Sequence, residues 1–256
     1  KYLTYRWKKD GGNLTGETNS TMTITDANAT LHDGNYSVVV SNDFGSVESD
    51  LTEVLVKDGI LNGLVGWWKF DEGSGTVAYD SSGNGHDGNL FGSPIWTVGK
   101  IGGALTFDGQ NDYVLVTKDF GAILSISAWA KRSSGDDLML WCFGNQQTGP
   151  DLFFHQNKLF LNTWDGDANL FGNFLPEINT WYNFITIISS IETKQYINGT
   201  LLGSANYKSP TGKNFYISMK EHGQGDYSWS GSIDDVRIYD RALSAEEVQA
   251  LYNFGQ

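Results

Sequence analysis

The chain contains 256 residues and carries a formal net charge of −13, with a sequence pI near 4.5. This length is enough for one large domain or two smaller ones, and either arrangement can bury a sizeable core. The acidic excess makes nucleic acid and anionic membrane surfaces poor partners, because their phosphates would be repelled over most of the surface. No apolar run is long enough to span a bilayer, so we expect no membrane insertion.

Glycine is abundant (31 residues), proline is scarce (4 residues) and aromatic residues make up 14% of the chain. This composition is typical of many short strands joined by tight turns, with aromatic rings in the core or on a binding face. The single cysteine, Cys142, lies in an apolar run, which predicts a buried thiol and excludes an intrachain disulfide. The chain starts at Lys1 without a methionine or a signal peptide, which indicates a piece of a longer polypeptide.

The first segment, residues 1–57, contains short alternating stretches that predict strands at 5–8, 21–24, 36–40 and 51–56. Its patterns Y-x-W-x-K-D-G, S-T-M-T-I and D-G-N-Y-S-V-V-V-S-N resemble bacterial immunoglobulin-like domains. The resemblance implies that Trp7 is the core tryptophan of strand C and that Tyr36 forms the tyrosine corner before strand F. Nothing precedes strand C, so it implies a partial immunoglobulin-like domain without strands A and B. One apolar sheet face would then be exposed unless another element covers it.

Residues 58–63 are expected to form a linker and residues 64–256 a second domain. Alternating apolar and polar residues predict strands at 125–130, 158–161 and 181–187, and Asn198-Gly199 predicts a type I′ hairpin turn. Ser244 followed by Glu247 is a capping box, which predicts a short helix that begins after Ser244.

Six motifs follow one another along this second segment: W-x-F-D-E-G-S-G, D-S-S-G-N-G-x-D-G, G-x-x-G-x-A-L-x-F-D-G, I-S-A-W, Y-I-N-G and the closing G-x-I-D-D-V-R-I-Y-x-R-A-L-S-x-x-E. Together they resemble the laminin-G-like, concanavalin A-like jelly rolls. The resemblance implies two antiparallel sheets packed together, with the first and last strands adjacent. The expected fold class is all-β: a concanavalin A-like β-sandwich (jelly roll) plus a partial immunoglobulin-like β-sandwich.

The loop 80–88 and the last strand offer oxygen ligands for a metal ion. Calcium takes roughly six to eight oxygen ligands and tolerates irregular geometry, so it suits carboxylates and the carbonyls of glycine-rich loops. The resemblance also implies calcium between the chain ends of such a sandwich, with Asp234 preferred over Asp235. We expect a structural Ca²⁺ that pins loops. Its predicted ligands are Asp80, Asn84, Asp87, Asp234 and Asp235. The alternative is that the aspartates cap turns and accept backbone hydrogen bonds.

Two parts of the sequence combine aromatic side chains with amides and carboxylates: residues 153–157 together with Asn162 and 164–167, and the loop 221–229. Sugars present apolar C–H faces and rings of hydroxyls, so their sites pair stacking aromatics with planar polar groups. The predicted ligand-binding residues are His155, Asn162, Trp164, Asp165, Gln224, Tyr227 and Trp229. For Trp164, Tyr227 and Trp229 the alternative is packing within their own loops. Trp68, Trp129 and Trp181 lie in predicted strands and are expected in the core.

Catalytic jelly rolls of this superfamily include glycoside hydrolases and polysaccharide lyases. The hydrolase branch carries its acids on one strand as E-x-D-x-x-E, and the lyase branch uses Q-x-H with Y-x-K-x-G-x-Y. Residues 64–256 contain none of these patterns, and the chain has no nucleophile elbow, phosphate loop or dinucleotide fingerprint. We therefore expect no catalytic activity in this chain.

The expected function is non-catalytic, lectin-like carbohydrate binding by a module of a secreted or cell-surface bacterial protein. Its expected partners are a polysaccharide or glycan and other domains of a larger parent protein. A protein–protein adhesion or spacer module is the alternative, because exposed loop aromatics suit either role. A polysaccharide-degrading enzyme is the third alternative.

Overall fold

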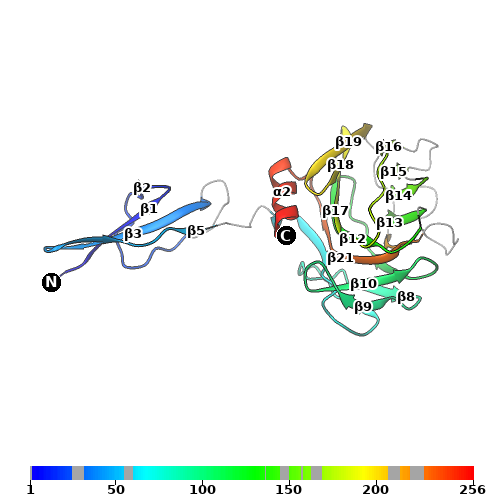
Figure 1. The fold of residues 1–256 in the computed structure, drawn as a ribbon, viewed down its shortest axis with the longest axis horizontal. Coiled ribbons are helices and arrows are strands. Elements are labelled where there is room, and N and C mark those ends of the chain that lie inside the picture. Colours follow the sequence, from blue (N-terminus) through cyan, green and yellow to red (C-terminus); the bar gives the residue numbers. More distant parts are fainter. Residues whose placement is uncertain are drawn as a thin grey trace. The chain divides into compact units, whose positions relative to one another are not determined.

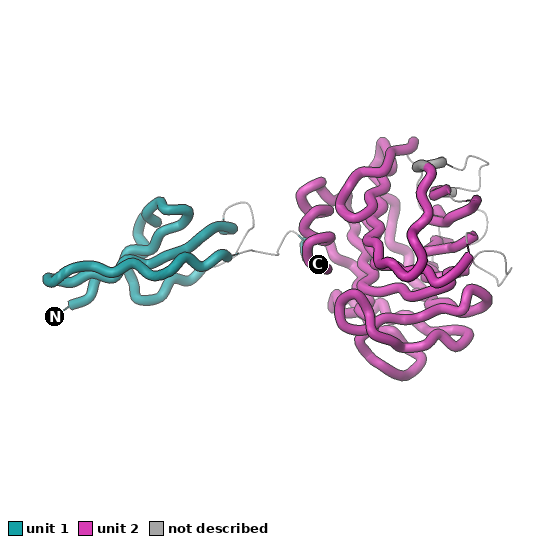
Figure 2. Tube along the Cα trace, in the orientation of Figure 1, with its two compact units in different colours: residues 1–62 teal, residues 63–256 magenta. Residues whose placement is uncertain are grey.

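A computed structural model describes residues 2–24, 32–54, 60–135, 137–144, 150–156, 158–162, 169–206, 214–219 and 228–256. The chain divides into two compact units, residues 1–62 and residues 63–256 (Figure 2). The boundary lies inside the segment that the sequence assigns to a linker. In the described residues, no helix has the length and apolar character needed to cross a membrane.

The first unit contains one antiparallel sheet, with the strand order β2-β1-β3-β4 and with β5 also paired to β3 (Figure 1). Its strands are β1 (Thr4–Lys9), β2 (Gly12–Asn13), β3 (Gly34–Asn42), β4 (Gly45–Glu48) and β5 (Thr52–Val54). Residues 21–24 are predicted as a strand but form none. Their alternating pattern has no partner strand among the described residues, and a strand needs one to satisfy its backbone groups.

The sheet of the first unit has one apolar face and one polar face. Tyr5 lies opposite Val40 and Trp7 opposite Val38, whereas the intervening positions are polar except for Val39, which lies opposite Arg6. Trp7 and Val38 are only half-buried. Among residues 2–24 and 32–54, Tyr36 is the one buried hydrophobic side chain. This sheet therefore has little core of its own.

Tyr36 makes the contact that the sequence predicts for a tyrosine corner. Its hydroxyl donates a hydrogen bond of 2.8 Å to the backbone carbonyl of His32, four residues upstream. A tyrosine corner has this geometry. The immunoglobulin-like identity of the unit stays a prediction.

The second unit consists of two antiparallel sheets that pack face to face. The first sheet has the order β19-β18-β17-β12-β21-β10-β9, with β6 also paired to β21. Its strands are β6 (Leu64–Trp68), β9 (Ile95–Val98), β10 (Gly103–Asp108), β12 (Leu124–Arg132), β17 (Tyr182–Ile188), β18 (Glu192–Ile197), β19 (Thr200–Asn206) and β21 (Ser230–Tyr239). The first and last strands of the unit, β6 and β21, are therefore neighbours, with Trp68 opposite Val236.

The second sheet has the order β16-β15-β14-β13-β20-β11-β8-β7. Its strands are β7 (Val77–Ala78), β8 (Gly88–Phe91), β11 (Tyr113–Thr117), β13 (Leu138–Phe143), β14 (Asp151–His155), β15 (Lys158–Asn162), β16 (Asn169–Gly172) and β20 (Asn214–Ile217). The all-β sandwich predicted from the sequence is confirmed.

Alternating residues of both sheets fill the space between them. Ile126 and Ala128 of β12 and Leu138 and Leu140 of β13 belong to one cluster of buried side chains, which also contains Trp68. The opposite face of the first sheet is covered by helix α2 (Ala245–Phe254) (Figure 1). Trp129 of that face is buried and stacks on Tyr252 of the helix at 5.8 Å between ring centroids. Trp181 is half-buried.

Two local predictions are confirmed in atomic detail. The Ser244 hydroxyl accepts the backbone N–H of Glu247, whose carboxylate accepts the Ser244 N–H, so the capping box starts α2. Asn198 and Gly199 both have positive φ, at 50° and 75°, in the hairpin between β18 and β19. Cys142 is buried, as its apolar surroundings predict.

Candidate functional site: the outer face of the second sheet

The second sheet has one face in the core and one face turned away from the first sheet. In β14, Leu152 and Phe154 belong to the core cluster, whereas Phe153 packs against a separate cluster around Met139 and Cys142. Because successive side chains of a strand point to opposite faces, this alternation defines an outer face. Its described members are Asn89, Phe91, Tyr113, Leu115, Thr117, Met139, Cys142, Asp151, Phe153, His155, Lys158, Phe160, Asn214 and Tyr216.

Five aromatic residues lie on this outer face, four of them in two stacked pairs. Phe91 of β8 stacks on Tyr113 of β11, with 4.8 Å between ring centroids and 9° between planes. Phe153 of β14 stacks on Phe160 of β15 at 5.3 Å and 17°. Each pair consists of directly opposite residues on neighbouring strands, which is why the rings meet.

The two pairs are more accessible than the centre of the face. The side chain of Phe91 is 41% exposed, and Tyr113, Phe153 and Phe160 are half-buried. Tyr216, between the pairs, is only 7% exposed. Met139 and Cys142, in the middle of the face, are likewise buried. The more accessible aromatic side chains of the described outer face therefore lie at its two ends.

Polar groups adjoin the Phe153–Phe160 pair. His155 lies opposite Lys158 at the end of the β14–β15 hairpin, and its Nδ1 is 2.6 Å from a carboxylate oxygen of Asp137. The backbone register places Asn162 of β15 opposite Asp151 at the other end of the hairpin. Two stacked rings with hydrogen-bonding groups around them can hold the apolar face of a sugar and its hydroxyls together.

Two of the predicted sugar-binding residues, His155 and Asn162, thus lie in one hairpin beside this pair. Trp164, Asp165, Gln224 and Tyr227 lie outside the described residues. The prediction that Trp229 binds sugar is wrong, because its side chain is fully buried in the core cluster. The centroid of its ring is 6.0 Å from that of Phe154. A sugar cannot contact this indole, so Trp229 is a packing residue, which is the alternative given above.

Phe153 belongs to a stretch that the sequence predicts to bind sugar, although it is not among the individual residues predicted above. Phe91, Tyr113 and Phe160 are not predicted as ligand-binding residues. The hairpin F-F-H-Q-N-K-L-F contains a usable signal, because Phe153 and Phe160 are equidistant from its turn and must share a face. Phe91 and Tyr113 lie 22 positions apart in the sequence, and only the pairing of β8 with β11 brings them together.

The predicted calcium ligands are held by hydrogen bonds instead of being gathered around a point. Asp80 accepts four of them: from the N–H groups of Trp67, Ser82 and His86 and from the Ser82 hydroxyl, at 2.8–3.0 Å. An ionised carboxylate offers about four lone-pair positions, so these donors occupy all of them. Burial opposes ionisation of Asp80, but these donors outweigh it and keep its pKa below the usual range.

Asp87 accepts the backbone N–H of Asp80 through one oxygen, and Asn84 donates to the Leu64 carbonyl. These contacts match the turn-capping alternative. In the described part of the chain, no group of three or more His, Cys, Asp or Glu side chains is placed to hold a metal ion.

Asp234 and Asp235 lie on β21, next to β6 and β12, and they differ in their partners. Asp235 accepts the Trp67 indole N–H at 2.7 Å and pairs with the buried Arg237 guanidinium at 3.0 Å. The Arg237 guanidinium already neutralises the Asp235 carboxylate, and four hydrogen-bond donors already occupy the Asp80 carboxylate. Asp80 and Asp235 therefore do not fit a calcium site. Asp234 accepts the Ile101 N–H through one oxygen, and its other oxygen has no donor. Calcium stays a prediction for the remaining residues.

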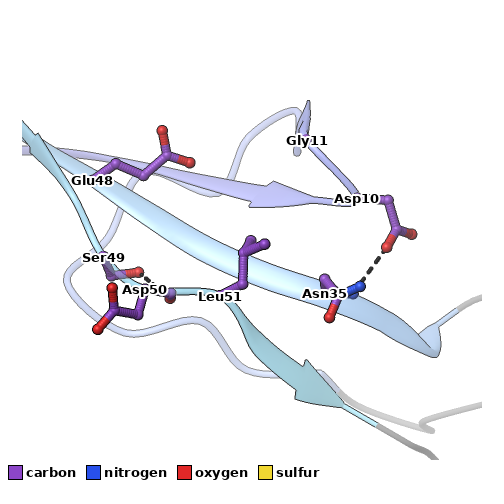
Figure 3. Close-up of a pocket in the computed structure, with 7 residues that line it drawn as sticks. All are labelled: Asp10, Gly11, Asn35, Glu48, Ser49, Asp50 and Leu51. Carbon is purple, nitrogen blue, oxygen red and sulfur yellow. Dashed lines mark hydrogen bonds between the residues drawn. The ribbon is translucent and has the colours of Figure 1, made fainter.

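The first unit carries an acidic hollow of about 820 Å³ (Figure 3). It contains Glu48 and Asp50, which with Glu53 have the spacing E-x-D-x-x-E given above for hydrolases. Hydrolysis needs two carboxylates that face one bond. Figure 3 shows Glu48 and Asp50 pointing away from each other. Glu48 is held by Lys8 and Ser37 at 2.8 and 2.7 Å, so this spacing does not form a catalytic pair.

Comparisons with known proteins agree with the sandwich. No curated protein sequence matches the chain. Domain 4 of AbnA, a GH43 extracellular arabinanase from Geobacillus stearothermophilus, solved in complex with arabinotriose, has a TM-score of 0.62 and 21% identity. That match covers 74% of this chain and 98% of the domain.

Toxin binding domains are similar as well. The binding domain of Paraclostridial Mosquitocidal Protein 1 has a TM-score of 0.61 and 17% identity over 76% of this chain. The binding domain of botulinum neurotoxin DC in complex with SialylT has a TM-score of 0.58 and 16% identity over 77%. This chain spans 53% and 52% of these two domains. At such identities the likeness establishes the fold.

A match to a family model shows to which superfamily the chain belongs. The model described as the concanavalin A-like lectin/glucanases superfamily matches residues 108–249, more than half of the 256 residues. The matched range runs from the end of β10 into α2 and includes strands of both sheets. The chain therefore belongs to the concanavalin A-like lectin/glucanases superfamily.

Proposed function

We propose that the second unit is a non-catalytic carbohydrate-binding module and that the Phe153–Phe160 pair is its central contact. The observation that carries this proposal is a stacked, half-buried ring pair on the outer face, beside His155 and Lys158. An apolar surface that faces water costs free energy unless a ligand covers it. Pyranose and furanose rings supply a C–H face of matching shape, and their hydroxyls reach the polar neighbours.

The similar structures support a glycan as the ligand. One was solved with arabinotriose and another with SialylT, and the first belongs to an extracellular enzyme. By analogy we propose that this chain serves a secreted or cell-surface protein, in which the first unit is part of an immunoglobulin-like spacer. The tyrosine-corner contact of Tyr36 supports that last point.

A protein-adhesion role is the second candidate, and one observation favours it. Strand β9 lies at the edge of the first sheet, where Ile95 and Val98 are 67% and 80% exposed. Edge strands with apolar side chains are sites at which another chain can pair. A protein partner would contact this edge, whereas a glycan would contact the outer face of the second sheet.

The test is retention of the chain by immobilised polysaccharides, followed by titration with the glycan that retains it. Phe160→Ala removes one ring of the pair, and we expect about tenfold weaker binding, since a stacked aromatic contact contributes roughly 1 kcal/mol. Phe160→Leu keeps the apolar volume and controls for lost packing. Ile191→Ala, at a residue that is 78% exposed in the β17–β18 turn, is the matched surface control.

Equal binding by wild type, Phe160→Ala and Phe160→Leu would contradict the proposal. So would retention by no polysaccharide, in which case pairing through β9 becomes the function to test. Thermal unfolding of each variant separates a binding loss from a folding loss.

A further inference from the structure

We propose that the Phe91–Tyr113 pair is a second glycan contact on the same outer face, so that the module binds an extended neutral polysaccharide at two points. This inference rests on the proposed function, because it assigns the class of ligand that the face accommodates. The first support is the exposure of the pair. Phe91 is the most exposed aromatic side chain on the described outer face, and the stack with Tyr113, 9° from parallel, fixes the orientation of its ring.

Packing in the core does not account for Phe91. Its neighbour Leu90 and the residues Val114 and Val116 of β11 are the side chains that these two strands contribute to the core. Phe91 lies on the other face, where its ring contacts Tyr113 and solvent. A large exposed ring that the core does not need is available for a ligand.

The backbone on both sides of the pair is fixed by Asp112. One oxygen of this buried carboxylate accepts the Ser93 N–H at 2.6 Å, and the other accepts the Asp108 N–H at 3.1 Å. Gly92, directly after Phe91, has φ of 76° and leaves no room for a Cβ beside Asp112. The two rings therefore sit on a chain that is ordered before any ligand arrives, which lowers the entropy cost of binding.

The distance between the two pairs sets the length of the ligand. In the strand order β15-β14-β13-β20-β11-β8, the middle of one pair and the middle of the other are four strand intervals apart. At about 4.8 Å per interval, the pairs are separated by roughly 19 Å. A short oligosaccharide can cover only one pair, whereas a polysaccharide chain that runs across the strands can contact both. Two linked contacts raise the affinity beyond either one alone.

The polar side chains that β8 and β11 place on the outer face favour uncharged sugars. Asn89 lies two residues before Phe91 on this face and is exposed, and Thr117 is exposed at the other end of β11, four residues from Tyr113. Amides and hydroxyls bind sugar hydroxyls without regard to charge. Among the described outer-face residues Lys158 is the one lysine or arginine, and the chain has a net charge of −13. Acidic polysaccharides would be repelled by this charge.

The experiment compares short and long ligands. Arabinan, xylan, mannan and β-glucan, each with its trisaccharide, are titrated against the whole chain, with polygalacturonate as the acidic comparison. Phe91→Ala is expected to weaken binding of the polymer about tenfold and to leave the trisaccharide affinity unchanged. Phe160→Ala should weaken both. Ile191→Ala, at an exposed apolar residue in the β17–β18 turn of the first sheet, is the control.

Each outcome separates this inference from the proposed function. Polymer binding by Phe91→Ala at the level of Ile191→Ala overturns the second contact and leaves the proposed function standing. An equal loss for polymer and trisaccharide overturns the two-point arrangement, and preference for polygalacturonate overturns the neutral ligand. If the wild-type chain binds none of the glycans, the proposed function fails first. Phe91→Leu, which keeps an apolar side chain without a flat ring, should resemble Phe91→Ala.

Discussion

Asp234 is a buried carboxyl with one unsatisfied oxygen. It has no exposed surface, the Ile101 N–H donates to one of its oxygens at 2.8 Å, and the other oxygen has no hydrogen-bond partner. Burial raises its pKa to about 7, and the like charge of Asp235 adds to this effect, although the Ile101 N–H opposes it. At neutral pH the folded state therefore holds part of its Asp234 population protonated, whereas the unfolded chain ionises it.

This difference predicts the pH dependence of stability. Because the folded pKa is above the unfolded value of 3.8, the contribution of Asp234 is complete below pH 3.8 and is lost as the pH rises to about 7. Asp234→Asn cannot ionise, so its free energy of unfolding relative to wild type should rise between pH 5 and pH 8 by on the order of 1 kcal/mol or more. Urea unfolding at both pH values measures it, with exposed Asp43→Asn as the control. A constant difference would show that Asp234 ionises normally.

Arg237 is the counter-charge that stabilises the buried carboxylate of Asp235. Its guanidinium is fully buried, lies 4.4 Å from the ring of Trp67 and 4.8 Å from that of Phe254, and pairs with Asp235. Its loss would leave a buried carboxylate without a counter-charge.

Arg237→Met should therefore lower the free energy of unfolding by about 3 kcal/mol or more. The matched control is Arg241→Met, which breaks a more exposed pair with Glu247 and should cost about 1 kcal/mol or less. Urea unfolding of both variants gives the comparison. Similar losses in the two variants would mean that Asp235 is solvated or protonated when Arg237 is absent.

At the scale of elements, the loop 80–88 is held by Asp80. The four donors to its carboxylate come from β6 and from the loop itself, so they tie the first strand of the unit to this loop. The loop therefore has an anchor that needs no metal ion.

We expect the Asp80 anchor to act in EDTA as well as in millimolar calcium, because four donors already occupy the Asp80 carboxylate. Asp80→Ala should therefore lower the melting temperature by several degrees in both buffers, since it leaves these donors unpaired. A loss in calcium alone would contradict this expectation. A calcium-dependent rise of the wild-type melting temperature that disappears in Asp87→Asn would support the predicted calcium site at Asn84 and Asp87.

Local sequence was sufficient to predict a hairpin turn and a helix start, but it was not sufficient to predict which segments form strands of a sheet. Asn198-Gly199 and the capping box at Ser244 involve residues within three positions of each other, so their geometry follows from the local chain. The failed strand at 21–24 shows the limit. Alternation permits a strand, but only a partner with free backbone groups forms one.

At the scale of the whole molecule, the two units differ in how much core they contain. The second unit buries a continuous cluster between its sheets, whereas the described first unit buries only Tyr36 among its sheet hydrophobics. The sequence indicates this difference, because the first segment resembles only part of an immunoglobulin-like domain. The face proposed to bind a glycan belongs to the unit with the complete sandwich, whose paired strands can hold aromatic rings in fixed positions.

The sequence by itself determined the all-β class, the superfamily resemblance, the hairpin turn and the helix cap, because alternation and turn chemistry act over a few residues. It also pointed to the hairpin that carries His155. Only the tertiary structure decided that Trp229 is buried, that Asp80 is satisfied by backbone donors and that Phe91 meets Tyr113. These outcomes depend on which strands become neighbours and in what register, and a shift of one residue would move every side chain of a strand to the other face.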